Sequence, residues 1–242
     1  MTSRSMPSAS STAAWIENYF RAHKERTAAV LSGPKRETWF SAETFVALCS
    51  SITPHPENPL FPNFSCWGEQ EFATVFALIE ATHPLAGEMR RKPDIVCYNA
   101  SMGTEAVEAV IEIKLVRNDE NPKSCLADLR KQLTNASLLF PNAEIIGIIF
   151  FAVAPYQTPE TSRKASEQLK QAIKDVFPTD AGFTEILKST LEPIFESVPT
   201  GFHFPQMHVS LSLAVIKHSP ASGAIDLPRS PGQYSTARVP TD

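Results

Sequence analysis

The chain has 242 residues, of which 43% are hydrophobic and 20% charged, so it can bury one sizeable core and has the composition of a globular protein. Its formal net charge of −4 argues against a protein that coats long duplex nucleic acid through bulk positive charge, but not against an enzyme with an acidic, cation-filled site. The four cysteines form no C-x-x-C pair, which argues against a structural zinc site. Two of them, Cys97 and Cys125, lie in apolar contexts typical of free thiols in a reducing compartment.

The two ends are predicted to be flexible tails. Residues 1–13 and 219–242 are rich in Ser, Pro and Gly and show no periodicity. No apolar segment follows Arg4, so we expect no secretory signal peptide and an intracellular protein, in the cytoplasm or nucleus. The longest apolar run, residues 145–155, is too short to span a bilayer, so we expect no membrane partner.

The first part of the chain is predicted to be a helical addition to the main domain. Residues 14–31 have helical apolar spacing and end at Ser-Gly-Pro, and Ser41 can cap a second helix over 42–50. Four prolines between 54 and 62 predict a loop. We therefore assign residues 14–64 to the helical addition with its Pro-rich loop, and residues 65–218 to the main domain.

The main domain is predicted to alternate helices and strands. The expected helices are 68–82, 123–139, 160–176 and 181–197. The expected strands are 93–99, 106–116, 145–153 and 207–217, and the sequence also allows a short strand near 88–91. This order predicts an α/β fold with a central mixed sheet flanked by helices.

Charged side chains occur inside two of these apolar strands. Side chains alternate along a strand, so Glu112 and Lys114 face one way while Ile113, between them, faces the other. If strands 93–99 and 106–116 pair as a hairpin, Asp94 near the start of one comes close to Glu112 near the end of the other. Two carboxylates that converge in a partly dry site repel each other, which is tolerable when a hard divalent cation lies between them.

These residues suit the hydrolysis of a phosphodiester. Mg²⁺ held by Asp94, Glu112 and the backbone carbonyl of Ile113 can polarise a phosphodiester oxygen and acidify a bound water. Lys114 can orient or help to deprotonate that water and offset negative charge in the transition state. We therefore expect Asp94, Glu112 and Lys114 to be the catalytic residues.

Pro93–Asp94 followed by Glu112–Ile113–Lys114 resembles the motif of the PD-(D/E)XK nuclease superfamily, whose fold is called restriction-endonuclease-like. The core of that superfamily is helix, three strands, helix and strand, with the motif on the second and third strands, and residues 68–153 resemble that order. The resemblance implies a nuclease dependent on Mg²⁺ (or Mn²⁺) that hydrolyses nucleic acid, with DNA favoured over RNA. Apart from the resemblance, the helical N-terminus and the strand at 207–217 are candidates for substrate recognition or for the formation of a homodimer.

The resemblance assigns further residues. Many members carry an acidic residue on the first core helix that joins the metal site, and Glu71 or Glu69 would match. Some branches carry a glutamine followed by a tyrosine on the second helix; Gln132 matches the glutamine, but Ala136 stands where the tyrosine would be. The basic candidates for contacts with nucleic-acid phosphates are Arg90, Arg91, Lys92, Arg130 and Lys131.

Each of these residues also has an ordinary structural explanation. Glu112 and Lys114 can form an ion pair on an exposed strand face, and Asp94 can belong to a turn after the proline. Glu69 and Glu71 are favourable near a helix N-terminus, and the basic residues can be solvated surface charges. A second hypothesis, motivated by the net charge of −4 and by Ala136 in place of the tyrosine, is a nuclease-like fold without cleavage that acts as a nucleic-acid-binding or protein-interaction module.

Overall fold

A computed structural model describes residues 9–31, 36–52, 64–68, 93–99, 107–156, 158–185, 193–200 and 207–219. The helices are α1 (Ala9–Ala22), α2 (Lys24–Leu31), α3 (Arg36–Ile52), α5 (Pro122–Leu139) and α6 (Pro159–Val176), with a short 3-10 turn η3 (Thr179–Ala181). The strands are β1 (Phe64–Gly68), β2 (Ile95–Asn99), β3 (Val107–Arg117), β4 (Glu144–Val153), β5 (Phe183–Glu185), β6 (Pro193–Pro199) and β7 (His208–His218).

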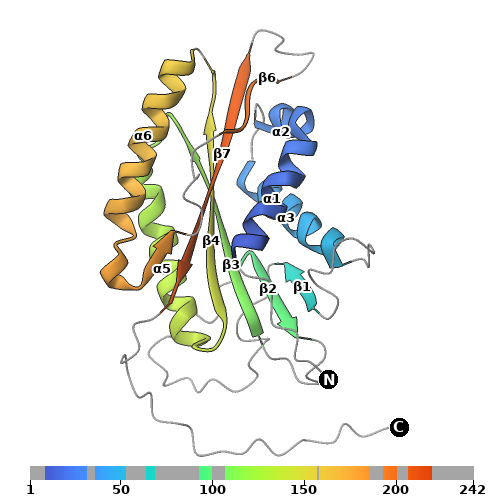
Figure 1. Ribbon diagram of the computed structural model, residues 1–242, viewed down its shortest axis with the longest axis vertical. Helices are drawn as coiled ribbons and strands as arrows, with labels where there is room; N and C mark the ends of the chain where they lie inside the picture. Colours follow the sequence, from blue (N-terminus) through green and yellow to red (C-terminus); the bar gives the residue numbers. More distant parts are fainter. Residues whose placement is uncertain are drawn as a thin grey trace, which may run out of the picture.

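The described strands form one mixed sheet with helices on both faces. The strand order is β1-β2-β3-β4-β7-β5, and β6 also pairs with β7. Helices α1, α2 and α3 lie on one side of the sheet, and α5 and α6 lie on the other (Figure 1). The α/β class and the central mixed sheet flanked by helices, both predicted from the sequence, are confirmed.

The first four strands lie in the sheet in chain order. Strands β1, β2 and β3 pair antiparallel, and β3 continues through α5 into β4, which lies parallel to β3. A parallel pair needs a crossover, and α5 supplies it. β4 lies between β3 and β7 and is buried almost throughout, which explains why its sequence is a continuous apolar run rather than an alternating one.

Strand β3 extends past the end of its neighbour β2. The pairing of β2 with β3 ends at Ile95↔Ile111, whereas β3 stays paired with β4 as far as Arg117↔Ala152. Within the residues that the structure describes, β3 residues 112–117 therefore have no strand on one edge. Backbone N–H and C=O groups on such an edge need other partners. This stretch is called the open edge of β3 below.

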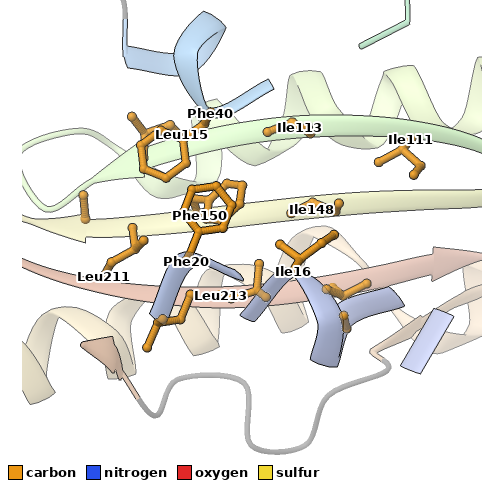
Figure 2. Close-up of a cluster of buried hydrophobic side chains, with 14 of the residues drawn as sticks. Ile16, Phe20, Phe40, Ile111, Ile113, Leu115, Ile148, Phe150, Leu211 and Leu213 are labelled. Carbon is orange, nitrogen blue, oxygen red and sulfur yellow. The ribbon is translucent and has the colours of Figure 1, made fainter. Parts of the chain in front are cut away.

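Apolar side chains form a core on each face of the sheet. The core on the side of α1, α2 and α3 is centred on three phenylalanine rings, Phe20, Phe40 and Phe150, shown in Figure 2. The core on the other side joins the sheet to α5 and α6. On that side Gly147 allows close packing, because a Cβ there would lie 2.8 Å from a methyl carbon of Leu133 on α5 and that side chain would have to shift.

Most of the predicted elements are confirmed, with shifted ends. The predicted helix 14–31 is interrupted at His23, which separates α1 from α2, and α1 begins at Ala9, inside the predicted N-terminal tail. The predicted cap at Ser41 is wrong, because α3 already begins at Arg36. The sheet begins at Phe64, one residue before the predicted domain boundary.

The predicted helix 181–197 is wrong where the structure describes it, at 181–185 and 193–197. These residues belong to the end of η3, to β5 and to β6, and β5 and β6 both pair with β7. Gly182 adopts a left-handed conformation with φ 81°, which ends the 3-10 turn and directs the chain into β5. Hydrogen bonding to β7 is a non-local interaction, and it overrides the local helical spacing.

Several predictions fall outside the described residues. They concern the Pro-rich loop 54–62, the helix 68–82 beyond Gly68, the short strand 88–91 and most of the C-terminal tail. Gly68 itself is the last residue of β1. Among the described helices, none is both long enough and apolar enough to cross a membrane.

His218, at the end of β7, is a buried titratable group far from the open edge of β3. Its ring lies 4.3 Å from the ring of Phe183, measured between centroids. Burial lowers the pKa of His218 below its ordinary value of 6.5, and the charge of Arg130 lowers it further, while a hydrogen bond with the backbone of Ala181 opposes both.

We expect the free energy of unfolding to fall as the pH drops below about 6.5. Below pH 6.5 the imidazole of His218 binds a proton in the unfolded protein, whereas in the folded protein it binds one only at a lower pH. The contribution of His218 to the free energy of unfolding is therefore fully present above pH 6.5 and is lost as the pH falls below it. Urea unfolding on either side of this pH should show a weaker pH dependence for His218→Phe than for the wild type. Equal pH dependence in the two proteins would contradict the role given to His218.

Candidate active site

Asp94 lies directly before β2 and binds the open edge of β3. Its carboxylate accepts a hydrogen bond from the N–H of Ile113 at 2.7 Å and another from the hydroxyl of Ser41 at 3.1 Å. Because Ile95 pairs with Ile111, Asp94 stands one residue beyond the last pair of the hairpin, beside Glu112. The predicted hairpin is confirmed, and the predicted approach of the Asp94 and Glu112 carboxylates stays a prediction.

Glu37, on the first turn of α3, binds the next position along the same edge. Its carboxylate accepts a hydrogen bond from the N–H of Leu115 at 3.4 Å, and each of its oxygens lies 3.2 Å from Nζ of Lys114. Ile113 and Leu115 are two residues apart, about 7 Å along a strand. Two carboxylates from different elements therefore stand side by side along the open edge of β3.

The backbone of Ile113 presents its carbonyl to this edge as well. In a β-strand the N–H and C=O groups of one residue point to the same neighbour. Because the N–H of Ile113 points to Asp94, its carbonyl oxygen also lies on the open edge. The predicted carbonyl ligand is thus on the same edge as the Asp94 and Glu37 carboxylates.

Glu112 and Lys114 lie on the face of β3 that is covered by α5. Glu112 is only 2% exposed and is paired in register with Gly147 of β4. Its burial excludes the ordinary explanation of Glu112 as a charge on an exposed strand face. Lys114 is half-buried, and its side chain reaches around the open edge to Glu37. A buried carboxylate and a half-buried ammonium are costly unless they are paired or hydrogen-bonded. Glu37 is such a partner for Lys114.

The donor set is that of a hard divalent cation. Every candidate ligand is an oxygen atom: the carboxylates of Glu37, Asp94 and Glu112, and the carbonyl of Ile113. Within the described part of the chain, no three His, Cys, Asp or Glu side chains gather closely enough to hold a metal ion. A cation at this edge would therefore draw on one or two carboxylates, the carbonyl and water. This partly hydrated coordination is the one that Mg²⁺ favours in proteins.

Cys125, on the first turn of α5, lies close to this edge but is poorly suited to be a nucleophile. Burial raises the pKa of its thiol above the ordinary value, and the charge of Glu120 raises it further, while Lys114 lowers it. The thiol therefore stays protonated at neutral pH, and the thiolate is the reactive form. The carboxylates and the lysine are therefore better candidates for chemistry at this edge than Cys125.

The other predicted residues are placed as follows. Glu69, Glu71, Arg90, Arg91 and Lys92 lie outside the described residues. The guanidinium of Arg130 lies 5.8 Å from the ring centroid of Phe183, at the end of the sheet where His218 pairs with Ile145.

This position separates Arg130 from the open edge. Ile145 is aligned with Val110, which is four residues, or about 13 Å, before Lys114 along β3. The neighbours of Arg130 on α5 are Lys131, which is exposed, and Gln132, which is half-buried. The structure therefore does not bring Arg130 to the carboxylates.

Sequence reasoning missed Glu37 and Ser41. The two lie four residues apart on α3, and the hydroxyl of Ser41 lies within hydrogen-bond distance of both the Glu37 carbonyl and the Asp94 carboxylate. The available signal was an acidic residue one turn before Ser41, in a helix that precedes the first strand. The helix that the sequence predicts, 42–50, begins too late to include Glu37.

Comparison of the chain with protein-family models, with curated proteins and with solved structures finds no match.

Proposed function

We propose that the chain is a metal-dependent nuclease that hydrolyses phosphodiester bonds of nucleic acid, with DNA favoured over RNA. The observation that carries this proposal is the meeting of Glu37, Asp94 and Lys114 along the open edge of β3. The three residues come from α3, from the start of β2 and from β3, so the fold itself assembles them. A cluster of carboxylates and one lysine on a strand edge suits phosphodiester hydrolysis.

The order of elements supports a restriction-endonuclease-like fold as part of the proposal. Among the described residues, which leave out 69–92 between β1 and β2, the order α3-β1-β2-β3-α5-β4 resembles the helix, three strands, helix and strand of the PD-(D/E)XK core. Asp94 then opens the second core strand, and Glu112 and Lys114 lie on the third. In this assignment α3 is the first core helix, and Glu37 takes the role that the sequence had suggested for Glu71 or Glu69.

The residues of the chain prepare the site for its substrate. One or two of the carboxylates of Asp94, Glu112 and Glu37, together with the Ile113 carbonyl and water, would hold Mg²⁺ or Mn²⁺, which would supply Lewis-acid polarisation of the phosphate and a more acidic water. The Ile113 N–H and the Ser41 hydroxyl fix the orientation of Asp94 before the substrate arrives. Lys114, held by Glu37, can donate a hydrogen bond to the attacking water or to a phosphoryl oxygen, where negative charge develops.

The direct test is cleavage of four substrates by the purified protein. Supercoiled plasmid, linear duplex DNA, single-stranded DNA and RNA are incubated with Mg²⁺, with Mn²⁺ and with a chelator. We expect cleavage of at least one DNA substrate with metal, none with chelator, and recovery when metal is added back. Cleavage that persists in chelator, or no cleavage of any substrate, would contradict the proposal.

A binding module without cleavage is the second candidate. It is favoured by the ion pair between Lys114 and Glu37, and by the finding that no three metal-ligating side chains gather among the described residues. A thermal shift separates the two functions. A nuclease should be stabilised by Mn²⁺, by about 2.7 kcal/mol at a concentration 100 times Kd, and Glu112→Gln should lose much of that gain. A binding module should show saturable binding of nucleic acid or a protein, with no metal-dependent stabilisation and no cleavage.

A further inference from the structure

Two arginines flank the carboxylates of the open edge. Arg36 is the first residue of α3 and directly precedes Glu37, and Arg117 is the last residue of β3. Arg117 lies two residues after Leu115, whose N–H is bound by Glu37, and alternation places both on the side of the sheet covered by α3. The contact between Glu37 and Leu115 therefore brings the two arginines into one neighbourhood.

The two guanidiniums act on each other electrostatically. Burial lowers the pKa of Arg36, and the positive charge of Arg117 lowers it further, while the acidic residues Asp119 and Glu120 oppose the shift. Two like charges held close together in a partly buried place repel each other, and a bound anion reduces that repulsion.

The hydrogen bonds of Arg117 leave one of its donors unused. Nη2 of Arg117 lies 3.1 Å from a carboxylate oxygen of Asp119. Glu120 accepts a hydrogen bond from the backbone N–H of Arg117, at 2.9 Å, rather than from its guanidinium. Nε of Arg117 is buried and has no hydrogen-bond partner within the described part of the chain. A buried donor without a partner is unusual, and water or a bound anion can supply the missing hydrogen bond.

We propose that Arg36 and Arg117 bind a backbone phosphate of the nucleic-acid strand, next to the phosphodiester that is cleaved beside Lys114. The planar guanidinium group matches the oxygens of a phosphate through paired hydrogen bonds. Lys114 lies three residues, or about 10 Å, before Arg117 and on the other face of β3, so the two residues take different phosphates. This inference rests on the proposed nuclease function and names residues that hold its substrate.

Arg36 and Arg117 also explain how a chain with a negative net charge can attract nucleic acid. A chain with a formal net charge of −4 lacks the bulk positive charge that draws many proteins to nucleic acid. Local positive charge at the site supplies the attraction instead, because each neutralised phosphate releases counterions. Binding should therefore depend on salt with a slope set by a small number of contacts, two of which are Arg36 and Arg117.

The test is binding of nucleic acid in chelator, which separates binding from cleavage. Fluorescence anisotropy is measured for labelled duplex DNA, single-stranded DNA and RNA of the same mixed sequence, across a range of salt concentrations. We expect Arg36→Gln and Arg117→Gln each to weaken the binding of at least one of the three nucleic acids about tenfold. Each should also make the fall of log K with log salt less steep, by about one unit of slope. Arg163→Gln, which removes an exposed arginine of α6 on the other side of the sheet, should change neither quantity.

A conservative variant distinguishes a phosphate contact from a structural role. Arg117→Lys keeps the charge beside Asp119 but loses the planar fork, so it should restore the salt slope while recovering only part of the affinity. If Arg117→Gln melts far below the wild type, Arg117→Lys answers the question with the fold preserved. Salt slopes equal to that of the wild type in every arm, for both arginine positions, would overturn the inference.

Failure of the inference can be told apart from failure of the proposed function. A wild type that cleaves DNA with Mg²⁺, with binding unaffected by Arg36→Gln and Arg117→Gln, overturns the phosphate contact and leaves the nuclease proposal in place. A wild type that neither cleaves nor binds any of the substrates overturns both.

Discussion

Replacing Lys114 by methionine is expected to lower the rate of phosphodiester cleavage by about 10²- to 10³-fold while the protein stays folded. Methionine keeps most of the length and apolar character of the side chain but removes its charge. The ammonium lies 3.2 Å from both oxygens of Glu37, so it is already positioned when substrate arrives, and its loss removes a preorganised positive charge. Stability should change by about 1 kcal/mol or less, because Lys114 is 21% exposed and Glu37 is 44% exposed.

The measurement is a single-turnover rate, with enzyme in excess over labelled DNA and Mg²⁺ present. The matched control is Lys217→Met, which breaks the pair between Lys217 and Glu144, another half-buried ion pair between two elements. That pair lies toward the other end of the sheet, because Lys217 is aligned with Ile146. The control should cleave DNA at the wild-type rate. A wild-type rate for Lys114→Met, or an equal loss in both variants, would contradict a catalytic role for Lys114.

Much of the fold could be predicted because its strands carry local signals. β4 is a continuous apolar run, and β3 alternates in a way that separates Glu112 and Lys114 from Ile111, Ile113 and Leu115. The alternation predicted correctly which β3 side chains share a face, and the hairpin of β2 with β3 was confirmed by the register. These features depend on neighbours in sequence, so the sequence alone displays them.

The rest depends on contacts between residues far apart in the chain. Glu37 is 77 positions from Lys114, and its role becomes visible only when α3 packs across the sheet and its first turn reaches the open edge. Residues 181–197 have helical apolar spacing, yet pairing with β7 makes β5 and β6 strands. In both cases a tertiary contact decides a local outcome, and no window of sequence contains both partners.

The dependence of the site on α3 leads to a second prediction with a large effect. Replacing Phe150 by alanine is expected to lower the free energy of unfolding by about 3–5 kcal/mol. Phe150 is fully buried, and its ring centroid lies 4.8 Å from that of Phe20 on α1 and 4.6 Å from that of Phe40 on α3 (Figure 2). One ring of β4 thus holds two helices against the sheet, and its removal leaves a cavity between three elements.

The position of Phe150 also links this core to the open edge. Phe150 is aligned with Leu115, the residue whose N–H binds Glu37, and Phe40 lies one helical turn after Glu37 on α3. Loss of the ring should therefore weaken the packing of α3 against the sheet, and lower the cleavage rate as well as the free energy of unfolding. Phe150→Leu keeps most of the apolar volume, so it should cost markedly less stability and retain more activity.

Urea unfolding followed by two signals shows whether the helices and the sheet form one cooperative unit. Trp67 lies on β1, so the wild type and Phe150→Ala are both compared with Trp67 replaced by phenylalanine. Trp15 on α1 donates its indole N–H to the Ala47 carbonyl on α3, and Trp39 packs against Phe20 and Phe40, so the remaining fluorescence reports on the contact between these helices. Far-ultraviolet circular dichroism reports on all of the secondary structure. If Phe150 joins the helices to the sheet, both signals should change together in the wild type and shift together in Phe150→Ala. A fluorescence change that precedes the loss of circular dichroism in the wild type would make α1 and α3 a separate unit. Glu37 would then be carried by an element that can leave the sheet while the rest of the fold persists.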